Sequence, residues 1–211
     1  MAVQPVVLGV LASGRGSNLQ AILDAIKAGR CPARVAVVVS DRAGAPALDR
    51  AGRAGVKAVH LDPQAYADRA AFDRDVAKVL ADHGVELVCL AGYMRLLSPG
   101  FVAAFRGRIL NIHPALLPAF PGLHAQRQAL EHGVKVAGAT VHVVDEGVDT
   151  GPIVLQAAVP VQEDDTEATL SARILAEEHR LYPEAIRLFA ERRLEIAGGR
   201  VRIRPEAGPS R

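Results

Sequence analysis

Short apolar runs alternate with helix-periodic segments along the first half of the chain. The apolar runs predict strands at Val6–Ala12, Val35–Val39, Val56–Leu61, Val85–Ala91 and Arg108–Ile112. The segments between them repeat apolar residues at helical spacing and predict helices at Leu19–Lys27, Ala45–Arg53 and Tyr66–His83. Repeated strand–helix units of this length favour an α/β fold with a doubly wound, mostly parallel sheet, similar to a Rossmann fold.

The pattern changes after residue 122. The remaining segments predict a helix at Leu123–His132, a strand at Thr140–Val144, a β-rich run at Ile153–Val161, the longest helix at Thr166–Arg192 and a hairpin at Leu194–Ile203. The β-rich run is typical of an antiparallel strand at a sheet edge, and we expect residues 205–211 to fray. Because no linker divides the chain, we expect residues 1–211 to form a single domain with a long C-terminal helix and a hairpin.

Composition narrows the class of protein. Half of the 211 residues are apolar, and the net charge of +2 comes from scattered Lys and Arg residues, a pattern unlike that of a nucleic-acid binder. No apolar stretch approaches the roughly 20 residues of a membrane span, and the first residues lack the basic segment of a signal peptide. Cys31 and Cys89 lack metal-ligand spacing and fit reduced thiols. We therefore expect a cytoplasmic protein that contacts neither membrane nor nucleic acid.

A glycine-rich turn follows the first strand and precedes a helix. Such a turn presents backbone N–H groups at the positive end of a helix, which favours an anion. A dinucleotide fingerprint would need glycine where Leu19 stands, and no Gly-Lys-Ser/Thr follows for a Walker A loop. A terminal monophosphate held by Gly16, Ser17 and Asn18 remains, and so does a plain helix cap formed by Ser17 or Asn18.

Asn111 and His113 end the fifth predicted strand, just before Pro114. Residues two apart on a strand point to the same face, and the carboxyl edge of an open α/β sheet is where ligands bind. An amide donor beside a histidine suits a carbonyl that becomes an oxyanion. Taken singly, His113 would fit a core histidine and Asn111 a turn residue, whereas the pair favours an active site.

An acidic loop follows the strand at residues 140–144. Asp145, Glu146 and Asp149 suggest calcium, but the segment lacks the flanking helices and the terminal glutamate of an EF-hand loop. One carboxylate near His113 would orient the ring, and Asp149 is best placed if the loop folds back. From the residues alone, Asp149 is not separable from Asp145 or Glu146, and all three also fit solvated loop acids.

The segment after the fourth predicted strand, residues 92–99, is apolar where loops are usually polar. It could line a pocket for a flat heterocycle. Ser98 and Pro99 also fit the cap and first residue of a following helix.

Several of these segments occur together, in order, in one known family. They are Gly16-Ser17-Asn18, Ala91–Pro99, Asn111–Pro118, Phe120–His124, Val141-His142 and Asp149–Pro152. The chain resembles the phosphoribosylglycinamide formyltransferases, a folate-dependent formyltransferase family of purine synthesis, over residues 6–190. The Asn, His and Asp set is shared across enzymes that use 10-formyltetrahydrofolate, so it indicates the chemistry, while the Gly-Ser-Asn loop indicates the acceptor.

The resemblance implies a role for each matching residue. It implies catalysis by Asn111, His113 and Asp149, phosphate binding by Gly16, Ser17 and Asn18, and ribose binding by Glu178. It also implies a folate site formed by Arg69, Met94, Arg95, Leu96, Leu97, Asn111, Asp145 and Glu146. As a general division, we expect the N-terminal half to bind the ribonucleotide and the C-terminal half the folate. Some family members place a polar or cationic residue where this chain has Leu175, so a cation from that helix is in doubt here, and Arg15 is a candidate to replace it.

The implied reaction is direct formyl transfer from 10-formyltetrahydrofolate, without a metal, with Asn111 and His113 donating hydrogen bonds to the oxyanion. The partners would be two small molecules, glycinamide ribonucleotide and the folate, and the enzyme a monomer or a homodimer. A 10-formyltetrahydrofolate hydrolase is an alternative, although such relatives usually carry an additional N-terminal domain. A non-catalytic nucleotide-binding module is another, but it would leave the Asn, His and Asp set without a role.

Overall fold

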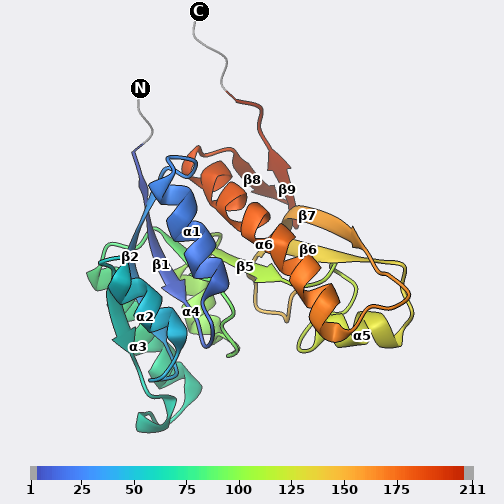
Figure 1. Cartoon of the computed structure of the whole chain (residues 1–211). Coiled ribbons are helices and arrows are strands. Elements are labelled where there is room, and N and C mark those ends of the chain that lie inside the picture. Colours follow the sequence, from blue (N-terminus) through green and yellow to red (C-terminus); the bar gives the residue numbers. More distant parts are fainter. Residues whose placement is uncertain (1–3, 207–211) are drawn as a thin grey trace, which may run out of the picture.

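A seven-stranded sheet in the order β3-β2-β1-β4-β5-β6-β7 runs through the computed structural model of the chain, which describes residues 4–206 (Figure 1). Its strands are β1 (Val6–Leu11), β2 (Ala33–Ser40), β3 (Lys57–His60), β4 (Leu87–Leu90), β5 (Ile109–His113), β6 (Val136–Val143) and β7 (Ile153–Pro160). Strands β1 to β5 pair in parallel, and β6 and β7 add on in antiparallel fashion. The mostly parallel sheet with an antiparallel edge is therefore confirmed.

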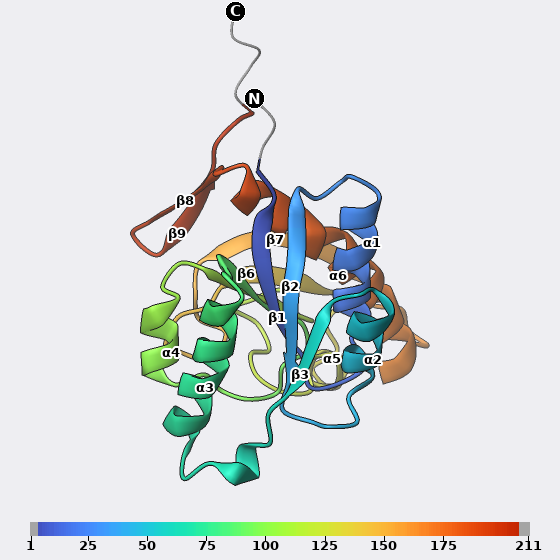
Figure 2. The same cartoon turned by 90° about the vertical axis from the view of Figure 1, so that its left-hand side faces the viewer.

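Helices cover both faces of this sheet. They are α1 (Ser17–Lys27), α2 (Pro46–Arg53), α3 (Arg69–Asp82), α4 (Pro99–Ala104), α5 (Ala125–Glu131) and α6 (Glu167–Ala190), with a short 3₁₀ turn, η1 (Pro63–Ala65). Figure 2 shows α1, α2 and α6 on one side of the sheet and α3 and α4 on the other. The doubly wound arrangement follows from parallel strands, which must bury both faces.

The core consists of two clusters, one on each face of the sheet. Successive strand residues alternate between them, so that Val38 packs toward α1, α2 and α6, while Val37 and Val39 pack toward α3 and α4. Tyr182 of α6 is fully buried, and its hydroxyl lies 3.0 Å from the Leu90 carbonyl and 2.8 Å from the Leu110 carbonyl. This contact fixes the long helix across β4 and β5.

Element bounds differ from the predictions mainly where a polar cap intervenes. The helix predicted from Tyr66 begins instead at Arg69, because the Asp68 side chain accepts a hydrogen bond from Ala71 N and caps it there. Strand β6 begins at Val136, earlier than predicted, and Gly138 lies so close to the Ala157 carbonyl of β7 that a side chain would not fit.

The C-terminal hairpin is confirmed as β8 (Leu194–Ala197) and β9 (Arg200–Ile203), which project from the rest of the fold in Figure 2. Residues 204–206 have no regular structure, while residues 207–211 of the predicted frayed tail lie outside the described residues. Among residues 4–206, no helix is long and apolar enough to cross a membrane.

Candidate active site

The loops at the carboxyl ends of β1, β4 and β5 meet at one edge of the sheet. The Ser13 hydroxyl, just after β1, accepts a hydrogen bond from Met94 N in the loop after β4. Strand β5 places Asn111 opposite His142 of β6 in the antiparallel register. This is the edge at which open α/β sheets bind ligands, so the predicted site residues are delivered to one place by the topology itself.

Asp149 is the carboxylate that reaches the Asn111–His113 pair. Its Oδ2 lies 3.4 Å from His113 Nδ1 and its Oδ1 lies 3.4 Å from Asn111 Nδ2. Its Oδ2 also accepts a hydrogen bond of 2.8 Å from Gly122 N. The acidic loop therefore folds back as the sequence suggested, and of its three acids Asp149 is the one that contacts His113.

Both ring nitrogens of His113 face oxygen acceptors. His113 Nε2 donates a 2.8 Å hydrogen bond to the Phe120 carbonyl, and Nδ1 faces Asp149. The side chain is buried, with 5% of the residue exposed. The sequence predicts that His113 donates a hydrogen bond to an oxyanion. In this structure the Phe120 carbonyl already accepts the hydrogen bond from His113 Nε2, so this donation requires that contact to break.

His142 completes the cluster, and sequence reasoning assigned it no role. Its Nδ1 donates to the Val143 carbonyl at 3.2 Å, and its Nε2 lies 3.1 Å from Asn111 Nδ2 and 3.4 Å from Asp149 Oδ1. Asn111 Nδ2 thus lies between His142 Nε2 and Asp149 Oδ1, and these two neighbours orient the Asn111 amide. The signal available in the sequence was a histidine inside an apolar strand.

The electrostatics of the cluster favour a charged carboxylate at Asp149. Burial raises the pKa of this group, but hydrogen bonds from His142 and Gly122 N, together with the charges of His113 and His142, outweigh burial and hold the pKa below its ordinary value of 3.8. At neutral pH Asp149 is thus an ionised acceptor, able to stabilise positive charge on either ring.

The glycine-rich turn forms a nest of free N–H groups. The carbonyls of Gly14, Arg15 and Gly16 accept hydrogen bonds from Ala47 N, Arg50 Nε and Gln20 N respectively. Within residues 4–206, the backbone N–H groups of residues 14–19 have no acceptor. Gly16, with φ of 71°, is the N-cap of α1 and makes no side-chain cap bond. The plain-cap interpretation is therefore wrong, and the arrangement suits an anion.

Beside this nest, Asn18 and Glu178 form a buried polar pair. Asn18 Nδ2 donates to Glu178 Oε2 at 2.7 Å, while Asn18 Oδ1 has no partner among the described residues. Burial raises the pKa of Glu178, and the contacts with Asn18 and Arg15 offset only part of that effect. Leu175, one turn earlier on α6, supplies no charge here. The exposed Arg15, in contrast, lies on the glycine-rich turn itself, residues 13–18, which we call the anion loop. A buried carboxylate with an unpartnered amide oxygen beside it suits a ligand with hydroxyl groups.

The predicted folate segment presents apolar side chains to solvent. Met94 and Leu96 are 56% and 57% exposed, and Val148 of the acidic loop is 46% exposed. The guanidinium of Arg95 lies 4.9 Å from the Phe72 ring centre, which holds this loop against α3. Ser98 caps α4 and Pro99 follows as its first residue, as expected. Leu97 is half-buried and packs on the α3 side of the core.

Three predicted folate residues have no described contact with the catalytic cluster. Arg69 is the first residue of α3 and is exposed. Asp145 accepts hydrogen bonds from Gly147 N and the Thr150 hydroxyl, so it shapes the loop that carries Asp149. Glu146 is exposed on the same loop.

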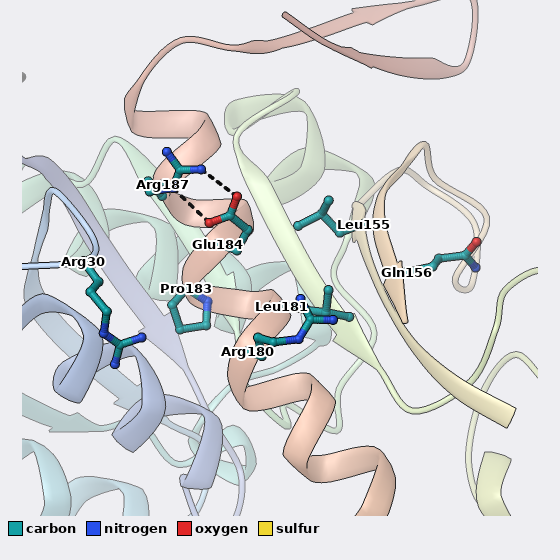
Figure 3. Close-up of a pocket in the computed structure, with 8 residues that line it drawn as sticks. All are labelled: Arg30, Leu155, Gln156, Arg180, Leu181, Pro183, Glu184 and Arg187. Carbon is teal, nitrogen blue, oxygen red and sulfur yellow. Dashed lines mark hydrogen bonds and ion pairs between the residues drawn. The ribbon is translucent and has the colours of Figure 1, made fainter. Parts of the chain in front are cut away.

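Two of the hollows on the surface of the described residues lie outside the catalytic cluster. The larger, of about 590 Å³, lies between α6, β7 and Arg30 (Figure 3); within it, Arg187 is paired with Glu184, as the dashed lines show. The smaller, of about 410 Å³, lies beside the anion loop and is lined by Ser17, Gln20, Ala21, Asp24, Arg30, Arg50 and His179. Across residues 4–206, no group of three or more His, Cys, Asp and Glu residues is arranged to hold a metal ion. Chemistry, not cavity size, therefore identifies the site.

Comparisons with known proteins agree on one family. The protein-family model described as formyl transferase matches residues 7–186. The phosphoribosylglycinamide formyltransferase of Escherichia coli (strain K12) is 46% identical over 187 residues, which cover 89% of this chain and 88% of that protein. The trifunctional purine biosynthetic protein adenosine-3 of Drosophila pseudoobscura pseudoobscura is 49% identical over 185 residues, but the chain spans only 14% of that relative's length. The crystal structure of glycinamide ribonucleotide transformylase 1 from Symbiobacterium toebii superposes with a TM-score of 0.93 and 68% identity, over 94% of each chain.

Proposed function

The chain belongs to the formyl transferase family, and we propose that it transfers the formyl group of 10-formyltetrahydrofolate to the amino group of 5-phosphoribosylglycinamide. One observation carries this assignment. A nest of free N–H groups and the Asn111, His113 and Asp149 cluster lie at the same edge of one sheet. The nest suits the phosphate end of the acceptor, and the cluster suits acyl chemistry at its other end. The reaction belongs to purine synthesis, as the names of the relatives indicate.

The acceptor would bind along the loop after β1 and the adjoining face of α6. The N–H groups of Gly16, Ser17 and Asn18 would hold the phosphate, and Glu178 would accept hydrogen bonds from ribose hydroxyls. The free Oδ1 of Asn18 would accept a further one. The charge of Arg15 lowers the pKa of Glu178, and Arg15 would supply the positive charge that Leu175 lacks.

The folate would bind across the loop after β4 and the acidic loop. The exposed side chains of Met94, Leu96 and Val148 fit an apolar ring system that needs cover from water. Backbone groups around Arg95 and Leu97 would add polar contacts to the ring edge. Arg69, at the rim, would meet the charged tail.

In the reaction, 10-formyltetrahydrofolate supplies the formyl group. The acceptor amine forms a bond to the formyl carbon, the bond from that carbon to folate N10 breaks, and one proton passes from the amine to N10. Asn111 Nδ2 would donate a hydrogen bond to the formyl oxygen as negative charge develops there, in place of its long 3.4 Å contact with Asp149 Oδ1. Asp149 would stabilise positive charge on His113 and relay the proton.

The contact between His113 and the Phe120 carbonyl adds a condition. For His113 Nε2 to donate to the formyl oxygen, the Phe120 carbonyl has to give up its 2.8 Å hydrogen bond. Phe120 and Gly122 both have positive φ angles, and Gly122 N is bonded to Asp149. The loop at residues 117–124 is thus tied to both members of the His–Asp pair, and we propose that it shifts when the substrates bind.

An absorbance assay of folate product tests the assignment. Purified protein is given 10-formyltetrahydrofolate with and without glycinamide ribonucleotide, and we expect product only with the ribonucleotide. Equal product in both would identify a hydrolase, and no product in either would support a binding module.

As a test of the oxyanion donor, Asn111→Ala should lower kcat on the order of a hundredfold. Near-normal kcat in a folded Asn111→Ala variant would contradict this role. We also predict a cytoplasmic location. The protein should be a monomer or a homodimer, and sedimentation would distinguish these two states.

A further inference from the structure

One side chain from a neighbouring helix is hydrogen-bonded to the backbone of the anion loop. Arg50 of α2 donates a 2.9 Å hydrogen bond from Nε to the backbone carbonyl of Arg15. The same guanidinium donates from Nη1 to Gln20 Oε1 at 3.1 Å, and Gln20 Nε2 donates to Asp24 Oδ1 at 2.9 Å. Arg50 is therefore held on one side by α1 and bonded on the other to the loop.

The bond matters because a carbonyl and the next N–H belong to one planar peptide unit. In a trans peptide these two groups point in opposite directions. With the Arg15 carbonyl directed toward Arg50, the Gly16 N–H is directed away from α2. If this peptide turned over, a carbonyl oxygen would replace a donor in the nest, and it would repel an anion.

Gly16 offers little resistance of its own to such a turn. Its φ is 71°, in the left-handed region, and rotation of the preceding peptide would carry φ toward negative values that glycine adopts equally well. Ala47 packs directly over Gly16, where a Cβ would lie 2.8 Å from the Ala47 Cα and Cβ atoms, and Ala47 N holds the Gly14 carbonyl. Within the described part of the chain, the Arg15–Gly16 peptide itself has only the Arg50 bond.

We propose that Arg50 is a positioning residue for phosphate binding: it fixes the Arg15–Gly16 peptide with its N–H toward the anion. This inference rests on the proposed function for the identity of the substrate, but the loop geometry stands independently of it. Because Arg50 acts through its donor at Nε, the hydrogen bond matters and the charge is secondary.

Two variants of equal length separate these contributions. Gln places its Nε2 the same number of bonds from Cα as the Nε of Arg, so Arg50→Gln keeps a donor and loses the charge. Arg50→Met keeps the length and loses the donor. Arg53→Ala, at an exposed position on α2 with no described contact to the loop, controls for removing a positive charge from the same helix.

Steady-state kinetics and phosphate binding provide the readouts. We expect Arg50→Met to raise the KM for glycinamide ribonucleotide and the inhibition constant of inorganic phosphate by about tenfold, while kcat and the KM for the folate stay within about twofold. Arg50→Gln should stay within about threefold of the original protein, and Arg53→Ala should match it. Equal KM values in Arg50→Met and the original protein would overturn the proposal. So would equal losses in Arg50→Gln and Arg50→Met, which would indicate direct contact of the charge with the phosphate.

A binding experiment separates failure of this inference from failure of the proposed function. Calorimetric titration with inorganic phosphate needs no reaction, and phosphate should bind the original protein more tightly than Arg50→Met even if no formyl transfer occurs. If Arg50→Met does not fold, Gln20→Ala removes the second hold on the guanidinium and should weaken phosphate binding by about threefold. Unchanged phosphate affinity in Gln20→Ala would then count against the proposal.

Discussion

Replacing Asp149 by Asn tests the electrostatic centre of the proposed mechanism. Asn has the same shape, and its Oδ1 still accepts a hydrogen bond from Gly122 N, which Asp149 receives at 2.8 Å. What disappears is the negative charge 3.4 Å from His113 Nδ1 and 3.4 Å from His142 Nε2. The variant therefore removes the charge and keeps the loop contact with Gly122 N, while its Nδ2 takes the position of Oδ1 and no longer accepts from Asn111 Nδ2.

The separation gives the expected magnitude. Two unit charges about 3.4 Å apart interact by about 5 kcal/mol at an effective dielectric constant of about 20. The Asn dipole and entering water recover part of this, so we take between half and all of it as lost when positive charge forms on His113. At about 1.4 kcal/mol per factor of ten, kcat should fall by a factor between about 60 and about 4,000.

The assay is the release of folate product at saturating concentrations of both substrates. Circular dichroism and thermal unfolding establish that Asp149→Asn is folded, and Asp82→Asn, on the exposed surface of α3, serves as a control that removes a carboxylate far from the cluster. A folded Asp149→Asn protein that keeps more than about a tenth of the original kcat would refute the electrostatic role, because the loss would then be under 1.4 kcal/mol.

Three further predictions concern the loop, the buried acid and pH. Burial raises the pKa of Glu178 above 4.5, so its contribution to stability is present below pH 4.5 and is lost as pH rises through the folded pKa. Glu178→Gln has no such charge to bury, so it should have a higher Tm than the original protein at pH 7 and a higher KM for the ribonucleotide. An unchanged KM would contradict ribose binding. Gly16→Ala should raise the same KM at least about tenfold, because the left-handed φ of 71° and the close approach of Ala47 force the loop to move, and tight phosphate binding in this variant would refute it. For Asp149, whose folded pKa lies below 3.8, urea unfolding should show stability that is complete above that pH and declines as pH falls through the folded pKa, with a shallower decline in Asp149→Asn.

Most of the fold was predictable because local patterns repeat along the chain. Buried parallel strands are continuous apolar runs, and amphipathic helices repeat every three to four residues, so the order of elements followed from spacing alone. The bounds that differed depend on side chains that cap or approach a neighbour, as Asp68 does at the start of α3 and Gly138 does against β7. Such contacts involve distant backbone or a single hydrogen bond, and no periodic signal records them.

The site was predictable in its residue types and less so in its contacts. Asn111 and His113 share a strand face, and Asp149 was favoured among three acids, which the structure supports by bringing it to His113. The sequence left open whether Ser17 or Asn18 caps the first helix or whether the turn binds a phosphate. In the structure the helix has no side-chain cap, and the N–H groups of residues 14–19 have no acceptor among the described residues. His142 reached the cluster through strand pairing with β5, and its role was not visible until the register was known.

The sequence by itself determined a doubly wound sheet, the glycine turn after its first strand and an amide–histidine pair at the end of its fifth, because each depends on neighbours within a few positions. Only the tertiary structure decided which carboxylate meets His113, that Phe120 occupies its outer nitrogen, and that Arg50 holds the Arg15 carbonyl. Those contacts join elements from separate parts of the chain, and their geometry is set by how helices and antiparallel strands pack on the sheet. Local pattern thus supplied the functional groups, and packing decided what each of them touches.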